Sequence, residues 1–349
     1  MKLRLLLLLT FPLVLWMAVA GGLVRVGVPV PTSAGGIGWH GALMVGGFFG
    51  SLIALERAVA LGKRWGWLAP VGAWLGALLL LAGRPEGMLL ITAASLMLVA
   101  MSVSVWRRQA QNFTFYLAVA AGCWSIGNVL WLMARPLAEV LGWWMAFLVL
   151  TIAAERLELS RFAPRPPWAE RAFDAVMLLW LAGLLSGAGL LTGLALLALA
   201  AWMVRFDVAR HTVRGQGLPR FVAICLLSGY AWLALSALAL MAGGGYQAGP
   251  GYDMALHGVV IGFVLSMVFG HALIILPAVS GLKARYRPQF YLPLLLLNIG
   301  LLIRFSGGWL VRADWVALGA SLNGVALLAF MLLVLNALRE GRRHSRPGR

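Results

Sequence analysis

The chain has 349 residues, of which 62% are hydrophobic and only 11% are charged, and its formal net charge is +17. A soluble domain of this size cannot bury so many apolar residues, so the composition predicts a polytopic membrane protein surrounded by the lipid bilayer. The basic residues form short clusters between apolar runs, which indicates cytoplasmic anchoring and argues against nucleic-acid binding. The two cysteines, Cys123 and Cys225, lack metal-type spacing and are expected to be small core residues.

Apolar length and polar breaks predict an all-α fold with twelve transmembrane helices. The first apolar segment imitates a signal peptide, but it is long and completes an even number of spans, so we expect it to be retained. Residues 1–338 are predicted to form a single transmembrane domain, and residues 339–349 a basic cytoplasmic tail. The predicted spans cover residues 3–20, 38–61, 66–82, 87–105, 113–133, 138–157, 173–187, 189–205, 220–242, 254–277, 289–304 and 315–337.

The distribution of positive charge predicts the orientation of these spans. Of the 28 Lys and Arg residues, all fall on the side of the N-terminus except Arg25, Arg84, Arg135, Arg304 and Arg312. Because positively charged loops stay in the cytoplasm, this bias places both termini there and indicates a multi-pass protein of the cell membrane.

Two short echoes link the second, sixth and tenth predicted spans. The second span enters the membrane with His40-Gly41 and the tenth with His257-Gly258. Residues 53–57, IALER, recur as residues 152–156, IAAER. Because these spans are four apart in order, the echoes predict three four-helix units around a pseudo-threefold axis.

The two histidines of this repeat, His40 and His257, would both lie at the external membrane face. Two neutral imidazoles from different helices are the ligands of a six-coordinate haem, so the pair predicts a b-type haem. The alternative is two interfacial histidines that bind headgroups or carbonyl groups. Small residues that would let a flat ring approach are Gly41, Gly46, Gly47, Gly50, Gly258 and Gly262.

A second layer of polar groups, nearer the cytoplasm, contains Glu56, Glu155 and His271. His271 follows His257 by about four helical turns, as in membrane cytochromes that stack two haems. The matching position of the second span is Ala54, which argues against a second bis-histidine haem.

Three interpretations of this inner layer stay open. His271 could hold a five-coordinate haem, or it could join Glu56 and Glu155 around a metal ion with mixed nitrogen and oxygen ligands. The structural alternative is a network of ion pairs in which Glu56 binds Arg57 or Arg156.

The segments Trp39-His40-Gly41 to Gly50, and His257-Gly258 through Gly262 to His271, carry a resemblance to a known family. The chain resembles the catalytic subunit of the haem-copper oxidases and, more closely, the NnrS-type membrane proteins, divergent relatives associated with nitric oxide stress. This resemblance implies a twelve-helix layout in which the second and tenth helices hold haem, here through His40 and His257.

The departures from the family pattern narrow what the resemblance implies. Oxidases carry further histidines on spans six and seven, but no histidine lies between His40 and His211. NnrS-type proteins usually carry a histidine just before that of the second span, where this chain has Gly38. The resemblance therefore implies electron transfer or a nitric oxide response, with a redox partner protein and without oxygen reduction. The alternatives are a twelve-helix transporter and a non-catalytic subunit of a respiratory complex.

Overall fold

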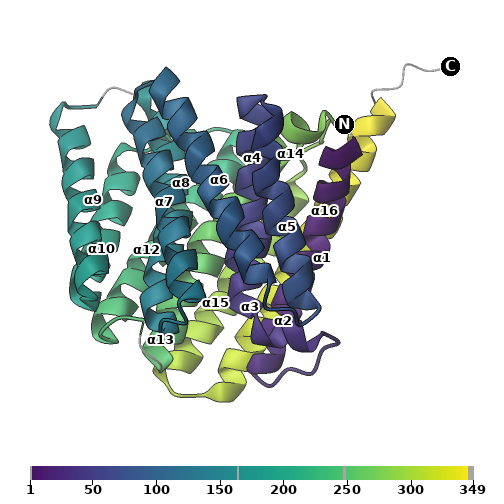
Figure 1. Ribbon diagram of the computed structural model, residues 1–349, viewed down its shortest axis with the longest axis vertical. Helices are drawn as coiled ribbons and strands as arrows, with labels where there is room; N and C mark the ends of the chain where they lie inside the picture. Colours follow the sequence, from purple (N-terminus) through teal and green to yellow (C-terminus); the bar gives the residue numbers. More distant parts are fainter. Residues whose placement is uncertain (1, 163–164, 247–248, 345–349) are drawn as a thin grey trace. The chain divides into compact units, whose positions relative to one another are not determined.

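The computed structural model describes residues 2–162, 165–246 and 249–344, and within these ranges every regular element is a helix (Figure 1). The predicted all-α fold is therefore confirmed. The last helix, α16 (Ala313–His344), continues past Arg339 into the predicted tail. The final part of that tail, residues 345–349, lies outside the described residues.

Contacts within the chain define two compact units. The first unit comprises Met1–Ala154 with Ala278–Ser280. In it, α5, α6 and α7 pack in series against one another, joined by short turns. Its elements are α1 (Lys2–Arg25), α2 (Ala34–Gly38), α3 (His40–Ala42), the π-helix η1 (Leu43–Gly50), α4 (Ser51–Leu61), the 3₁₀-helix η2 (Arg64–Trp67), α5 (Leu68–Leu81), α6 (Gly87–Arg108), α7 (Asn112–Leu132) and most of α8 (Leu137–Leu159).

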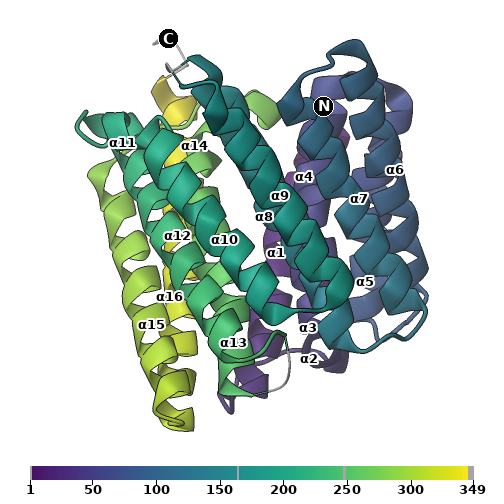
Figure 2. The same cartoon turned by 90° about the vertical axis from the view of Figure 1, so that its left-hand side faces the viewer.

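The second unit comprises Glu155–Pro277 with Gly281–Arg349. In it, α9 and α10 form an antiparallel hairpin, α10 packs on α12, and α15 packs on α16 (Figure 2). The hairpin turns at Gly187, whose φ of 68° is the left-handed conformation that favours glycine. Its elements after α8 are η3 (Ser160–Phe162), α9 (Trp168–Ser186), α10 (Gly189–Phe206), α11 (Ala209–Thr212), α12 (Gly217–Ala242), α13 (Pro250–His257), the π-helix η4 (Gly258–Leu265), α14 (Ser266–Ser280), η5 (Pro288–Phe290), α15 (Tyr291–Trp309) and α16.

Eleven helical spans of the described residues are long and apolar enough to cross a membrane. They correspond to eleven of the twelve predicted spans, and the protein is a polytopic membrane protein. The other predicted span, residues 173–187, belongs to α9. Three charged residues, Glu170, Arg171 and Asp174, make the first half of this helix less apolar than the others.

The second and tenth spans each contain a π-helix of 8 residues. η1 begins three residues after His40, whereas η4 directly follows His257. Each π-helix leads into the same pattern, Gly-Phe-x-x-Ser, at residues 47–51 and 262–266, and each serine donates its backbone N–H to the phenylalanine carbonyl. π-Helices are rare and often mark functional sites. The likeness of these two spans is therefore structural as well, while α8 is an uninterrupted α-helix and the threefold arrangement stays a prediction.

Small residues let the tenth span pack closely on α12. A methyl group added at Gly262 would lie 2.4 Å from Trp232, and one added at Gly270 would lie 3.1 Å from Cys225. Close packing of this kind replaces the hydrophobic effect, which cannot drive helix association in lipid. Cys225 and Cys123 are both buried and free, as predicted for core residues. The small residues recur at every fourth position: Gly258, Gly262, Ser266 and Gly270.

Gly262→Ala is expected to lower the free energy of unfolding by about 1–3 kcal/mol, because the added methyl group would overlap Trp232. Gly41→Ala is the matched control. Open space lies beside Gly41, and alanine favours a helix, so stability should stay the same or rise slightly. Thermal unfolding of the two purified variants distinguishes them, and equal midpoints would contradict the packing role of Gly262.

Candidate functional site

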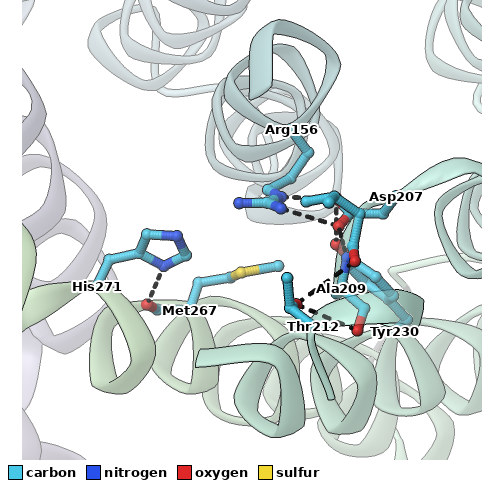
Figure 3. Close-up of polar contacts among 8 residues, drawn as sticks. Arg156, Asp207, Ala209, Thr212, Tyr230, Met267 and His271 are labelled. Carbon is cyan, nitrogen blue, oxygen red and sulfur yellow. Dashed lines mark hydrogen bonds and ion pairs between the residues drawn. The ribbon is translucent and has the colours of Figure 1, made fainter. Parts of the chain in front are cut away.

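Two buried charges of the second unit form an ion pair (Figure 3). Arg156 lies in the last turn of α8, and Asp207 directly follows α10. The Arg156 Nε lies 2.6 Å from Asp207 Oδ2, and Nη2 lies 2.8 Å from Oδ1. The two side chains are only 5% and 1% exposed. Such a bidentate pair is the geometry in which an arginine and a carboxylate bind most strongly, and it allows both charges to lie within a membrane-spanning bundle.

The Asp207 carboxylate accepts two further hydrogen bonds. The backbone N–H of Ala209 donates to Oδ1 over 2.6 Å, and the buried Tyr230 hydroxyl donates to Oδ2 over 3.0 Å. Four donors use the full acceptor capacity of a carboxylate. Asp207 therefore ties α8, α10 and α12 together and has no acceptor position left for a ligand.

His271, predicted as a ligand in the inner layer, lies on α14 in the same unit. Its Nδ1 lies 2.9 Å from the carbonyl oxygen of Met267, one turn earlier on the helix. In the view of Figure 3, His271 and Asp207 lie on opposite sides of the Arg156 guanidinium. Arg165, which lies outside the spans, also interacts electrostatically with the Asp207 carboxylate. Burial lowers the pKa of the Arg165 guanidinium, and the negative charges of Glu170 and Asp207 oppose that shift.

His257 takes part in a second ion cluster of this unit. Arg304 on α15 donates to the Asp253 carboxylate through Nε at 2.8 Å and Nη2 at 2.6 Å. The His257 Nδ1 lies 3.0 Å from the Asp253 carbonyl oxygen and 3.1 Å from its Oδ1. Arg304 Nη2 lies 3.2 Å from Nδ1 and 3.3 Å from Nε2, which places it over the ring face rather than on the line of either lone pair. The Nε2 lone pair therefore does not point at the guanidinium.

His40 belongs to the first unit and packs against α1. Its Nδ1 lies 2.6 Å from the carbonyl oxygen of Ala18. A methyl group added at Gly22 would lie 2.6 Å from the ring, so the imidazole rests on the α1 backbone. The neighbouring Trp39 meets Trp131 edge to face, with ring centroids 5.8 Å apart.

Beside most of the glycines that were expected to make room for a haem ring, the space is occupied by other residues of the protein. Gly46 meets Ile91, Gly47 meets Ala77, Gly50 meets Trp124, Gly258 meets Ser236, and Gly262 meets Trp232. Only Gly41 of the six has open space beside it. The interpretation of the other five as space for a ring is therefore wrong. Their small size serves helix packing, because it lets large neighbouring side chains approach the backbone.

The predicted metal ligands of the inner layer belong to different units. Glu56 lies in the first unit, whereas Glu155 and His271 lie in the second. Within the ranges that the structure describes, no three His, Cys, Asp or Glu side chains come together as metal ligands. A metal ion held by these three residues therefore stays a prediction. Arg156, which the alternative interpretation assigned to Glu56, has Asp207 as its bidentate partner.

Sequence reasoning missed Asp207, Tyr230, Asp253 and Arg304. One signal could have found the acids. Arg304 is the last residue of the predicted span 289–304, and a charge at the edge of the hydrocarbon needs a partner. With only 11 acidic residues in the chain, the candidates were few. The Gly-Phe-x-x-Ser recurrence was also visible in the sequence, but the histidine-glycine echo sets a different alignment of the same two spans.

Asp207→Ala is expected to lower the free energy of unfolding by about 3–5 kcal/mol, because it leaves the Arg156 charge buried without a partner. Tyr230→Phe removes one hydrogen bond and should cost about 1 kcal/mol. Glu139→Ala, which breaks the exposed pair with Arg135, should have little effect. Unfolding midpoints of the purified variants give this order, and an Asp207→Ala protein as stable as Glu139→Ala would contradict it.

Comparison with known proteins identifies one family. Residues 4–339 match the family described as "Domain of unknown function (DUF8744)". No curated protein and no solved structure matches the chain. The matched range includes most of both units and all of the clusters described above. The chain therefore belongs to the DUF8744 family.

Proposed function

We propose that this membrane protein binds b-type haem and serves electron transfer or the response to nitric oxide, with His40 and His257 as iron ligands. One observation carries the proposal: the histidines singled out by sequence each direct Nδ1 at a backbone carbonyl oxygen. A neutral imidazole that donates from Nδ1 presents its lone pair at Nε2. That is the tautomer and orientation in which protein histidines bind metals.

Each of the two histidines has a partner that orients its ring, which supports its role as an iron ligand. The Ala18 carbonyl orients the His40 ring, and the Asp253 carbonyl and carboxylate orient the His257 ring. Arg304 neutralises the Asp253 carboxylate, so that carboxylate can lie beside the imidazole within the bundle. A bound haem would supply one-electron chemistry and an affinity for nitric oxide.

The proposal leaves out oxygen reduction, because the chain has no histidines on spans six and seven to hold a second metal. His271, alone or with Glu56 and Glu155, is proposed as a second haem or metal position or as part of a proton path. We place the protein in the cell membrane with both termini in the cytoplasm, on the basis of its positive charge distribution. A redox partner protein belongs to the same proposal.

A transporter is the second candidate, and a specific observation favours it. The π-helices η1 and η4 interrupt two spans, and two Arg–Asp pairs lie partly or fully buried in the second unit. Transporters often build their sites from interrupted helices and buried charges. Substrate-dependent flux into proteoliposomes by a colourless protein would favour this candidate over the haem protein.

An absorption spectrum of the purified protein tests the haem proposal. We expect a Soret band that shifts on reduction with dithionite, and loss of haem in His40→Ala and in His257→Ala, because each substitution removes a ligand. His211→Ala is the matched control, since His211 is exposed on α11 and bonded to Arg210.

Elution profiles of the three variants show whether each one folds. A folded wild-type protein without haem after expression with added haem precursor would refute the proposal. Equal haem content in the wild type and in both His40→Ala and His257→Ala would refute the ligand assignment.

A further inference from the structure

Exposed arginines gather at one end of the second unit without a carboxylate to balance them. The connection from α10 to α12, residues 205–220, contains four arginines but one acid, Asp207. Asp207 is buried and already accepts four hydrogen bonds. The salt bridges of the described residues include none of the four arginines. All four are exposed: Arg205, Arg210, Arg214 and Arg220.

Contacts within the protein hold two of these guanidinium groups in place. Arg210 Nε donates to His211 Nε2 over 2.9 Å, and its Nη1 donates to the Arg205 carbonyl oxygen over 2.6 Å. The guanidinium carbon of Arg205 lies 5.1 Å from the centroid of the Phe206 ring, which is the range of a cation–π contact. A side chain that is already held in place loses little conformational freedom when a ligand binds to it.

The arginines lie where the second unit meets the surface of the bilayer. In Figure 2, α11 lies at the end of this unit where α10 stops and α12 begins. Trp168, at the start of α9, is 56% exposed and packs on Phe206 with ring centroids 5.3 Å apart. Val204, directly before Arg205, is 48% exposed within the span Gly189–Phe206. Exposed tryptophan at the end of a span is typical of the boundary between membrane and water.

A phospholipid with a negative headgroup fits both parts of this surface. Its phosphate oxygens accept hydrogen bonds from arginine forks, and its acyl chains cover exposed apolar side chains such as Val204. A soluble anion or an acidic protein would gain from the arginines alone. The neighbouring start of α9 does not cancel the positive charge, because residues 165–174 contain two arginines and two acids. Clusters of four or more basic residues directly beside a span are typical of sites for anionic lipids.

We propose that the connection between α10 and α12 binds the headgroup phosphate of an anionic phospholipid. Arg205, Arg210 and Arg214 donate hydrogen bonds to the phosphate, and Arg220 adds to the positive potential. The lipid tails lie along the ends of α9 and α10, beside Trp168 and Val204. The site uses none of the histidines proposed to hold haem, so it can be tested whether or not haem is bound.

Native mass spectrometry of the purified full-length protein, titrated with phosphatidylglycerol, tests the proposal. We expect saturable binding that is tighter than the binding of phosphatidylcholine and that soluble glycerol 3-phosphate does not displace. Arg214→Gln should weaken phosphatidylglycerol binding by about fivefold. The double variant with Arg210→Gln should weaken it by about 25-fold. Because the Arg214 side chain is exposed, its replacement leaves the helix ends intact even where the double variant does not fold.

Arg312→Gln is the matched control, because Arg312 is an exposed arginine of the same unit whose guanidinium already binds Asp314 at 2.7 Å. It should leave phosphatidylglycerol binding unchanged. Elution profiles show whether each variant is folded. Equal binding of phosphatidylglycerol and phosphatidylcholine would overturn the proposal, and so would equal binding by the wild type and Arg214→Gln. Displacement by glycerol 3-phosphate would assign the arginines to a soluble anion instead and would overturn it too.

Discussion

A polar group buried among apolar helices is costly unless it finds a partner inside the protein, and this constraint explains the clusters of the second unit. Asp207 accepts four hydrogen bonds. Arg304 donates to the Asp253 carboxylate and lies over the His257 imidazole. Burying a lone charge would cost free energy, whereas a charge that is paired and fully hydrogen-bonded can fix the positions of several helices. The ion pairs therefore connect helices whose residues are far apart in the sequence.

Close contact between helix backbones is the second requirement of a bundle in lipid. The tenth span meets it with small residues at every fourth position against α12, and the second span meets it at Gly46, Gly47 and Gly50. Large aromatic rings then fill the places that the glycines leave, as Trp124 does at Gly50 and Trp232 does at Gly262. These glycines thus mark where a neighbouring helix comes close to the backbone.

Span positions could be predicted from the sequence because apolar length is a local property, whereas partners could not. Arg156 and Asp207 are 51 residues apart, and so are Asp253 and Arg304, so neither pairing follows from a local pattern. The predicted roles of the glycines were wrong for the same reason, since a glycine beside a haem ring and a glycine beside Trp232 look alike in sequence. His40, His257 and His271 could be singled out because an ionisable residue in a span is rare, but Ala18, whose backbone carbonyl orients His40, carries no such mark.

The two π-helices lie at different distances from the histidines that precede them. Aligning the spans on their serines, Ser51 and Ser266, moves the histidines out of register by two positions, which turns one by more than half a helical turn relative to the other. The same alignment pairs Glu56 with His271, each five residues after its serine. The two spans thus carry opposite chemistry at this aligned position, with an acid in the second span and a base in the tenth.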